Sequence, residues 1–210
     1  DEKTAPAEPV LTPSQRRDLE IAFAKALDAS SDRRREYALA DELFRQCLKL
    51  DAGNALIVTP YLENLARRYG RVEKSSWGGW WRERGVLRSQ YPNALIRYHA
   101  ALEALSQTPS IRLLEVLAQC CRELDHDLAE EAYLREILKR DERYAAAHAR
   151  LAELRIAQAD FETARHHLEV IAGAIATPHA DACLEVVREE AVFEVDAAKL
   201  ASAEPQSVSE

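Results

Sequence analysis

The four cysteines are the residues best suited to metal or redox chemistry, but their spacing favours neither. They are Cys47, Cys120, Cys121 and Cys183, and no metal-finger spacing joins them. Neighbouring positions on a helix point about 100° apart, so Cys120 and Cys121 suit neither a disulfide nor a shared zinc ion. We therefore expect small, buried thiols in a reducing compartment.

Four histidines, at positions 126, 148, 166 and 167, have a structural explanation. His148 falls on the core-facing side of a predicted helix, so we expect a packed side chain rather than a catalyst. His166 and His167 are adjacent and cannot converge on one ion, which places them at the edge of the apolar stripe or in solvent. The Asp-His-Asp run at 125–127 could contribute metal ligands, but a capped turn between two helices explains the same residues.

No sequence pattern of an enzyme is present. The chain contains none of the nucleophile, phosphate-loop and metalloprotease patterns GxSxG, GxxxxGK[ST] and HExxH. The paired glutamates at 130–131 and 189–190 are expected on solvated helix faces, because nothing supplies the apolar pocket of an acid–base pair. We therefore expect no enzyme activity, no cofactor and no bound metal.

The charge balance and the apolar runs limit the partners. With 28 Lys and Arg against 36 Asp and Glu, the net charge is −8, and a nucleic-acid phosphate backbone would need a basic face. No apolar run approaches the roughly 20 residues that a membrane-spanning helix needs. The chain opens DEKTAPAEPV, without Met or a signal-like core. We expect any targeting segment to lie outside it, and a cytoplasmic rather than exported location.

A repeated helical pattern organises the chain around residues 145–178. Phe161, Ala164, Leu168 and Ile171 lie three or four residues apart, on one stripe of a helix. Small side chains at Ala164 and at Ala152 on the preceding helix let the two backbones approach closely. The same spacing recurs at Tyr37, Ala40, Phe44 and Cys47.

Further helices are indicated along the whole chain. Thr12 is a cap residue, followed by Pro at the first helical position and Gln at the third. Helices are expected at about 54–69 and 91–106, and Thr108 is expected to cap the next one. Thr177 is expected to cap a long last helix that reaches about residue 200.

This pattern resembles the tetratricopeptide repeat, a helix–turn–helix unit of about 34 residues that stacks into a solenoid. The resemblance is strongest at 145–178 and also covers 37–52 and 91–106. It implies an all-α, right-handed α-solenoid of about four helix pairs over residues 12–200, closed by a single C-terminal capping helix.

In this family the first helix of each pair lines a concave groove, so the resemblance implies groove positions in three pairs. They are Glu63 and Arg67; Arg112, Glu115, Gln119 and Arg122; and Ala149, Glu153 and Ile156. The groove would be mixed in charge, with an apolar patch near Ile156. Family members that clamp a chaperone's carboxylate tail use Lys and Asn where this chain has Glu63 and Arg67, so we do not expect that ligand.

Residues 71–90 lengthen the second pair and depart from the standard unit. Its candidate binding residues are Trp77, Trp80, Trp81, Arg82 and Arg84, including every tryptophan of the chain. Three explanations stay open. The tryptophans could cover the solenoid edge, form an exposed recognition loop of the Trp- and Arg-rich kind found at interface hot spots, or lie on a membrane surface.

Our leading hypothesis is a non-catalytic protein-interaction module. It would bind a peptide or a partner protein through the groove, the tryptophan insertion or both. The alternative is a structural subunit that self-associates as a homo-oligomer or braces a larger assembly. Residues 1–11 are expected to be a flexible lead-in, and 201–210 a disordered tail.

Overall fold

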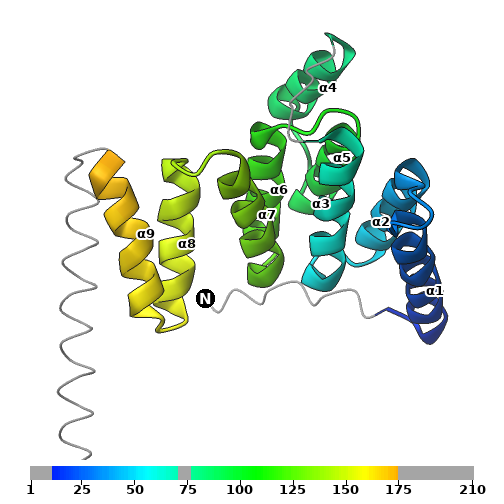
Figure 1. The fold of residues 1–210 in the computed structure, drawn as a ribbon, viewed down its shortest axis with the longest axis horizontal. Coiled ribbons are helices and arrows are strands. Elements are labelled where there is room, and N and C mark those ends of the chain that lie inside the picture. Colours follow the sequence, from blue (N-terminus) through cyan, green and yellow to red (C-terminus); the bar gives the residue numbers. More distant parts are fainter. Residues whose placement is uncertain (1–10, 71–76, 175–210) are drawn as a thin grey trace, which may run out of the picture. The chain divides into compact units, whose positions relative to one another are not determined.

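The computed structural model describes residues 11–70 and 77–174, with the backbone alone at 77–82 and 174. Every regular element among these residues is an α-helix, as Figure 1 shows. They are α1 (Pro13–Ser30), α2 (Tyr37–Leu50), α3 (Ala55–Tyr69), α4 (Trp77–Arg88), α5 (Ala94–Leu105), α6 (Ile111–Glu123), α7 (Asp127–Arg140), α8 (Ala145–Ala157) and α9 (Phe161–Ala174). The predicted all-α class is confirmed. The capping helix expected near 178–200 lies outside the described residues.

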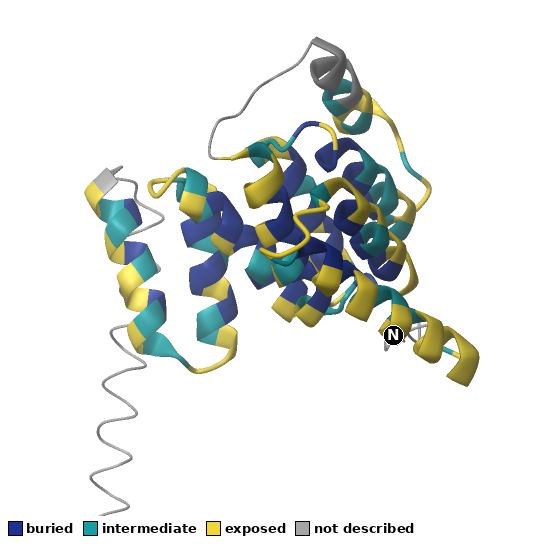
Figure 2. Ribbon diagram, turned by 45° about the vertical axis from the view of Figure 1, so that its right-hand side comes forward, coloured by how far each residue is buried: buried dark blue, intermediate teal, exposed yellow. Residues whose placement is uncertain are grey.

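The chain divides into two compact units, with the boundary between Arg140 and Asp141. In the first unit, α1, α3 and α7 lie side by side in one layer, and α2, α5 and α6 form the other. α4 packs on α5 and α6. Figure 2 shows buried residues between the helices, while the first half of α1 is largely exposed. Most contacts join helices that are consecutive in the chain, as in the solenoid architecture predicted from the sequence, and the contact of α3 with α7 departs from a regular repeat.

The start of α1 is fixed by the predicted capping box. The Gln15 N–H donates to Thr12 Oγ1 at 3.3 Å, and the Thr12 N–H donates to Gln15 Oε1 at 2.9 Å. Both groups would otherwise be left without a partner at the helix end, and Pro13 supplies a preset backbone angle at the first position.

Aromatic side chains run through the core of the first unit. The Phe44 ring packs edge-on against Phe23 and Tyr61, with ring centroids 6.2 and 6.3 Å apart. Tyr98 on α5 and Tyr133 on α7 also pack edge-on, and their hydroxyls are 2.8 Å apart. This last contact links the two layers through a hydrogen bond between fully buried groups.

The second predicted pair is joined differently from a helix hairpin. Tyr69, the last residue of α3, donates through Oη to the carbonyl oxygen of Ser106, just after α5, at 2.6 Å. The two helices therefore end on the same side and run in the same direction, whereas a hairpin would reverse them. The reason is the long connection at 70–93, which contains α4 and returns the chain to the side where α3 began. α3 packs mainly on α2 and α7 instead.

The second unit contains the predicted hairpin of α8 and α9. Ala152, Ala164, Leu168 and Ile171 form its buried cluster, as the spacing indicates. The turn between the helices contains Ala159 at φ 58°, the left-handed conformation that reverses the chain.

Two smaller predictions are wrong. The cap of α6 is Ser110 rather than Thr108, because Ser110 directly precedes the helix and its Oγ accepts from the Leu113 N–H at 3.2 Å. Glu130 and Glu131 are buried rather than solvated, because α7 packs against both α3 and α6.

The cysteines within the described residues are buried, free thiols, as expected: Cys47, Cys120 and Cys121. Burial raises the pKa of the Cys47 thiol to about 11, which keeps it protonated and unreactive at neutral pH. None of the helices in the described ranges is long and apolar enough to span a bilayer.

Candidate functional site

The tryptophan insertion contains a helix where the sequence suggested a loop. α4 begins at Trp77 and ends at Arg88, because the run from Arg82 onward is rich in helix-forming residues that outweigh the cost of the glycines. Trp77, Trp80, Trp81 and Arg82 have a helical backbone, and their side chains lie outside the described residues. Arg84 is half-buried. The three explanations for the tryptophans stay predictions.

The groove residues predicted on α3 are exposed. Glu63 is exposed, and the side chain of Arg67 is 45% exposed. The guanidinium of Arg67 donates to the carbonyl oxygen of Ser30 at 3.0 Å and lies 3.9 Å from the Asp32 carboxylate. Arg67 therefore ties α3 to the turn that follows α1.

The residues predicted on α6 do not lie alongside those of α3. Arg112, Gln119 and Arg122 are exposed and Glu115 is half-buried, so they share a surface of α6. α6 packs on α5 and α7 in the other layer of the first unit, rather than on α3. The cause is the direction of α5. It runs the same way as α3, so α6, which follows it, does not take the place of the first helix of the next repeat.

The residues predicted in the second unit have separate roles. Glu153 is exposed and accepts from Arg150 at 2.8 Å. Ile156 and Ala149 pack against the buried cluster of their own hairpin, so the expected apolar patch near Ile156 is largely used in packing.

The structure brings together a set of leucines that the sequence analysis missed. Leu56, the second residue of α3, is 78% exposed, and Leu128, the second residue of α7, is 67% exposed. A Cβ atom added to Gly53, before α3, would lie 2.4 Å from Nδ1 of His126, before α7. The two helices therefore start side by side, and their leucines share one end of the first unit.

We call Leu56, Leu128 and Leu50 the leucine surface. Leu50 ends α2 at the same end of the unit and is 40% exposed. Ile57 of α3 and Tyr133 of α7 are buried in the core, so Leu56 and Leu128 lie outside the buried faces of their helices. One sequence signal could have indicated these residues. Each is a leucine at the second position of a helix and lies outside the apolar stripe of that helix.

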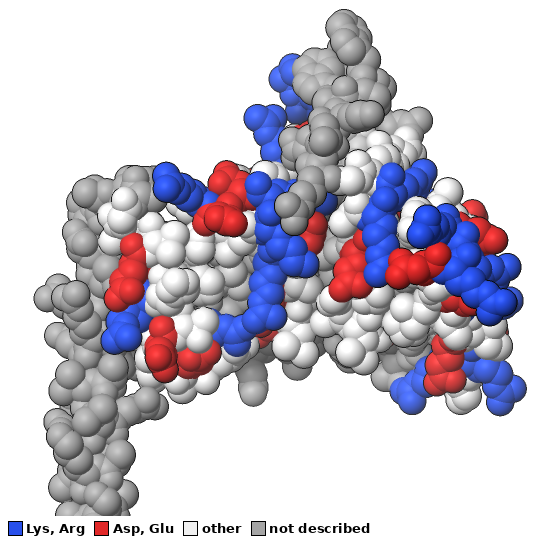
Figure 3. Space-filling view, viewed as in Figure 1, with Lys and Arg blue, Asp and Glu red and all other residues white. Residues whose placement is uncertain are grey.

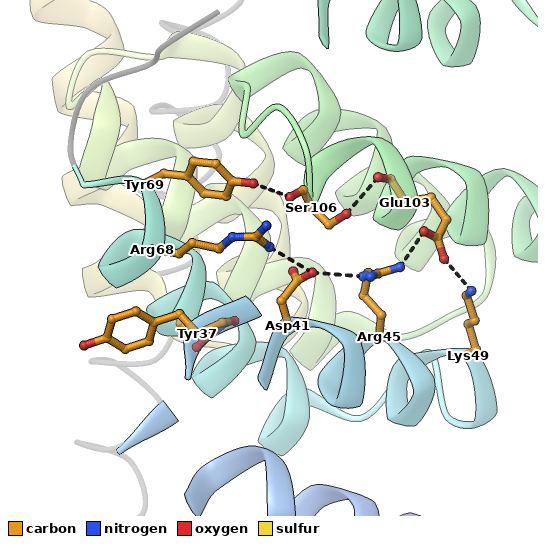
Figure 4. Close-up of polar contacts among 9 residues, drawn as sticks. Tyr37, Asp41, Arg45, Lys49, Arg68, Tyr69, Glu103 and Ser106 are labelled. Atoms are coloured by element: carbon orange, nitrogen blue, oxygen red, sulfur yellow. Dashed lines mark hydrogen bonds and ion pairs between the residues drawn. The ribbon is translucent and has the colours of Figure 1, made fainter. Parts of the chain in front are cut away.

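Ion pairs connect α2, α3 and α5 (Figure 4), and we call them the polar seam. Its residues are Asp41, Arg45, Lys49, Arg68 and Glu103. The buried carboxylate of Asp41 accepts through Oδ2 from Arg45 and Arg68, each at 3.2 Å. Glu103 of α5 accepts from both Arg45 and Lys49 of α2. Side chains of α2 thus connect it to both α3 and α5.

The charges of this seam are perturbed by burial. Burial raises the pKa of the Asp41 carboxyl above its usual range, against the pull of Arg45 and Arg68. Burial also pulls the pKa of Arg45 downward, but Asp41 and Glu103 outweigh it and hold that pKa above its ordinary value. The raised pKa of Asp41 indicates that burial outweighs the ion pair, whereas the raised pKa of Arg45 indicates that the ion pair outweighs burial. We take the ion pair as formed at neutral pH, because two guanidinium groups lie at hydrogen-bond distance from one carboxylate oxygen.

Three buried oxygen atoms lie beside these ion pairs, between α2 and α3. Asp41 Oδ1, Asn64 Oδ1 and the hydroxyl of Tyr61 are buried without a hydrogen-bond partner in the described residues. They come from the packed interface of α2 and α3, where Phe44 fills the space beside Tyr61. Within the described ranges, no group of three or more His, Cys, Asp or Glu side chains could hold a metal ion.

On one face of the molecule, the exposed charges of the described residues are of both signs. On the face drawn in Figure 3, Lys and Arg lie beside Asp and Glu over the described helices. Such a mixed face favours a protein partner over a polyanion on this side of the molecule.

We compared the chain with protein-family models, curated proteins and solved structures. No protein-family model and no curated protein matches the chain. Among solved structures, the chain is similar to the one described as the crystal structure of MamA protein, at a TM-score of 0.44 and 13% sequence identity. The match covers 86% of this chain and 88% of that chain. A likeness of this size identifies neither a family nor a function.

Proposed function

We propose that the chain is a non-catalytic protein-interaction module of the tetratricopeptide kind. The leucine surface of its first unit is the binding site. Support for the helical-repeat part comes from the stacked helices of the first unit and from the α8–α9 hairpin with its predicted small-residue contact. The groove and tryptophan residues predicted from the sequence remain candidates for additional contacts.

One observation carries the proposal: two large apolar side chains, Leu56 and Leu128, are 78% and 67% exposed at the starts of two helices that pack on each other. Isolated exposed leucines are ordinary, but adjacent ones on packed helices form a patch that water solvates poorly. The partner that fits is a protein offering apolar side chains, with Leu56 and Leu128 as anchors and the mixed charges around them as a polar rim.

The test is a double variant, Leu56→Ser with Leu128→Ser, in affinity capture from the source cells. Both positions are exposed, so the free energy of unfolding should change by less than about 0.5 kcal/mol. We expect a partner captured by the unaltered chain to be lost at least tenfold. Leu39→Ser is the control, because Leu39 is 47% exposed but lies near the start of α2, at the opposite end of that helix from Leu50. Equal loss in the control, or full capture by the double variant, would contradict the proposal.

The alternative function, self-association, is decided by the same variant. If the captured partner is a second copy of this chain, sedimentation should show an oligomer that the double variant dissociates and Leu39→Ser leaves intact.

A further inference from the structure

Acidic side chains lie in both turns beside the leucine surface. Asp51 directly follows Leu50, Asp127 directly precedes Leu128, and Asp125 lies in the turn before them. Asp125 and Asp127 are exposed, and Asp51 is half-buried. All three carboxylates are therefore at the end of the first unit that carries the leucine surface.

The fold explains where these carboxylates are held. Asp51 accepts through Oδ2 from the Asn54 side chain at 3.1 Å, and Asn54 accepts from the Leu56 N–H at 3.0 Å. Asp127 is in the first turn of α7, where the helix dipole favours negative charge. Asp125 has φ 59°, a left-handed conformation that Asp adopts more readily than most residues. These local roles fix the backbone of both turns.

The basic residues next to the same turns are already engaged. Lys49 forms an ion pair with Glu103, and Arg122, near the end of α6, is not without a partner. Asp125 and Asp127, in contrast, form no ion pair with a described residue. The leucine surface therefore has unpaired carboxylates beside it, which basic groups of a partner would complement.

The arrangement of the two helix starts fits a helix that lies across them. α3 and α7 pack on each other, and their first residues are side by side. Packed helices lie about 8–10 Å apart, and seven residues of a helix span about the same length, roughly 10 Å. Apolar side chains one heptad apart on a partner helix therefore reach both Leu56 and Leu128.

We propose that the occupant of the leucine surface is a basic amphipathic helix of a partner protein. Its apolar stripe packs on Leu56 and Leu128, and its Lys and Arg side chains pair with Asp125 and Asp127. The leucines supply most of the affinity, while the carboxylates select the charge of the partner. This inference rests on the proposed function and adds the chemistry of the partner to it.

Two synthetic peptides that differ only in charge test this chemistry on the full chain. Both repeat leucine at helical spacing over about two heptads. The remaining positions are all Lys in the Leu–Lys peptide and all Glu in the Leu–Glu peptide. In calorimetric titrations at low salt, the Leu–Lys peptide should bind at least about tenfold more tightly, and added salt should narrow the difference.

A charge-neutralising variant locates the binding. Asp125→Asn with Asp127→Asn should weaken binding of the Leu–Lys peptide about fivefold, because two exposed ion pairs are lost. Asp32→Asn with Glu36→Gln is the matched control. It removes the same charge from exposed positions in the turn before α2, at the opposite end of that helix from Leu50. The control should weaken binding by less than about twofold.

The outcomes separate this inference from the proposed function. Binding of neither peptide, equal binding of both, or an equal loss in the charge variant and its control would overturn the inference. The leucine surface itself would still stand if Leu56→Ser with Leu128→Ser lost the captured partner. Unchanged capture and unchanged peptide binding in that leucine variant would contradict both. An oligomer of the chain alone, dissociated by the leucine variant and unaffected by either peptide, would assign the surface to a second copy and overturn the inference.

Discussion

At the scale of single residues, the backbone of Gly53 lies close against the ring of His126. A Cβ atom at position 53 would lie 2.4 Å from Nδ1, 2.5 Å from Cγ and 2.7 Å from Cε1 of that ring. Glycine is needed here for space, and the contact aligns the starts of α3 and α7. The leucine surface depends on this alignment.

Gly53→Ala should therefore destabilise the chain by about 1–2 kcal/mol, because the His126 ring has to move. Urea unfolding measures this, and the double variant Gly53→Ala with His126→Ala should recover most of the loss. Gly85→Ala is the matched control. It lies inside α4, where an added Cβ meets nothing within 4 Å, and should stabilise by about 0.5–1 kcal/mol. A neutral Gly53→Ala would contradict the close packing of α3 on α7.

Glu103 gives a prediction about pH. Burial pulls its pKa upward, but the hydrogen bond from Lys49 and the charge of Arg45 outweigh burial and hold that pKa below its usual range. A carboxyl whose folded-state pKa is lowered stabilises the protein above its unfolded pKa and loses this contribution as the pH falls through the folded one.

Glu103→Gln should cost about 0.5 kcal/mol at neutral pH, a small value because the side chain is 42% exposed. The difference from wild type should vanish between about pH 5 and pH 2. Urea unfolding at several pH values measures it, with Glu63→Gln on the exposed face of α3 as the control. A difference that persists unchanged at low pH would show that Glu103 acts by packing alone.

At the scale of helices, the layers are joined by the hydroxyls of Tyr98 and Tyr133, 2.8 Å apart. Tyr98→Phe leaves the other hydroxyl buried without a partner, which should cost about 1–3 kcal/mol. Adding Tyr133→Phe removes that orphaned group, so the double variant should lose less than the sum of the two single variants. Thermal unfolding of the four proteins measures the coupling, and strict additivity would show that no hydrogen bond links α5 to α7.

The helices could be predicted where apolar residues recur every three or four positions. The three- and four-residue spacing from Phe161 to Ile171 and the small side chains at Ala152 and Ala164 indicated α8 and α9, because a short turn leaves two amphipathic helices no other way to bury their stripes. The capping box at Thr12 was equally readable. The shared direction of α3 and α5 was not, since no local residue pattern states whether a long connection returns the chain to the start of the previous helix.

The candidate site was the least predictable part for the same reason. Groove positions carried over from a regular repeat assume that α3 and α6 are neighbours, and the structure places α7 beside α3 instead. Leu56 and Leu128 lie far apart in the sequence. They come near each other because Gly53, before α3, lies against His126, before α7.

At the scale of the whole molecule, the two units have separate roles in this account. The first carries the leucine surface and the polar seam. The second carries the α8–α9 hairpin, whose buried cluster is formed by Ala152, Ala164, Leu168 and Ile171. The net charge of −8 and the mixed charges on the face drawn in Figure 3 support the proposal of a protein partner over a polyanion.

The most direct measurement of the central claim is site-specific photo-cross-linking in the source cells, with a photoreactive residue placed at position 56 or at position 128. We expect both positions to capture the same protein. A probe at Leu27, which is 42% exposed on α1, should not capture it. Capture of unrelated proteins at 56 and 128, or the same products from all three positions, would contradict a binding site formed by the leucine surface.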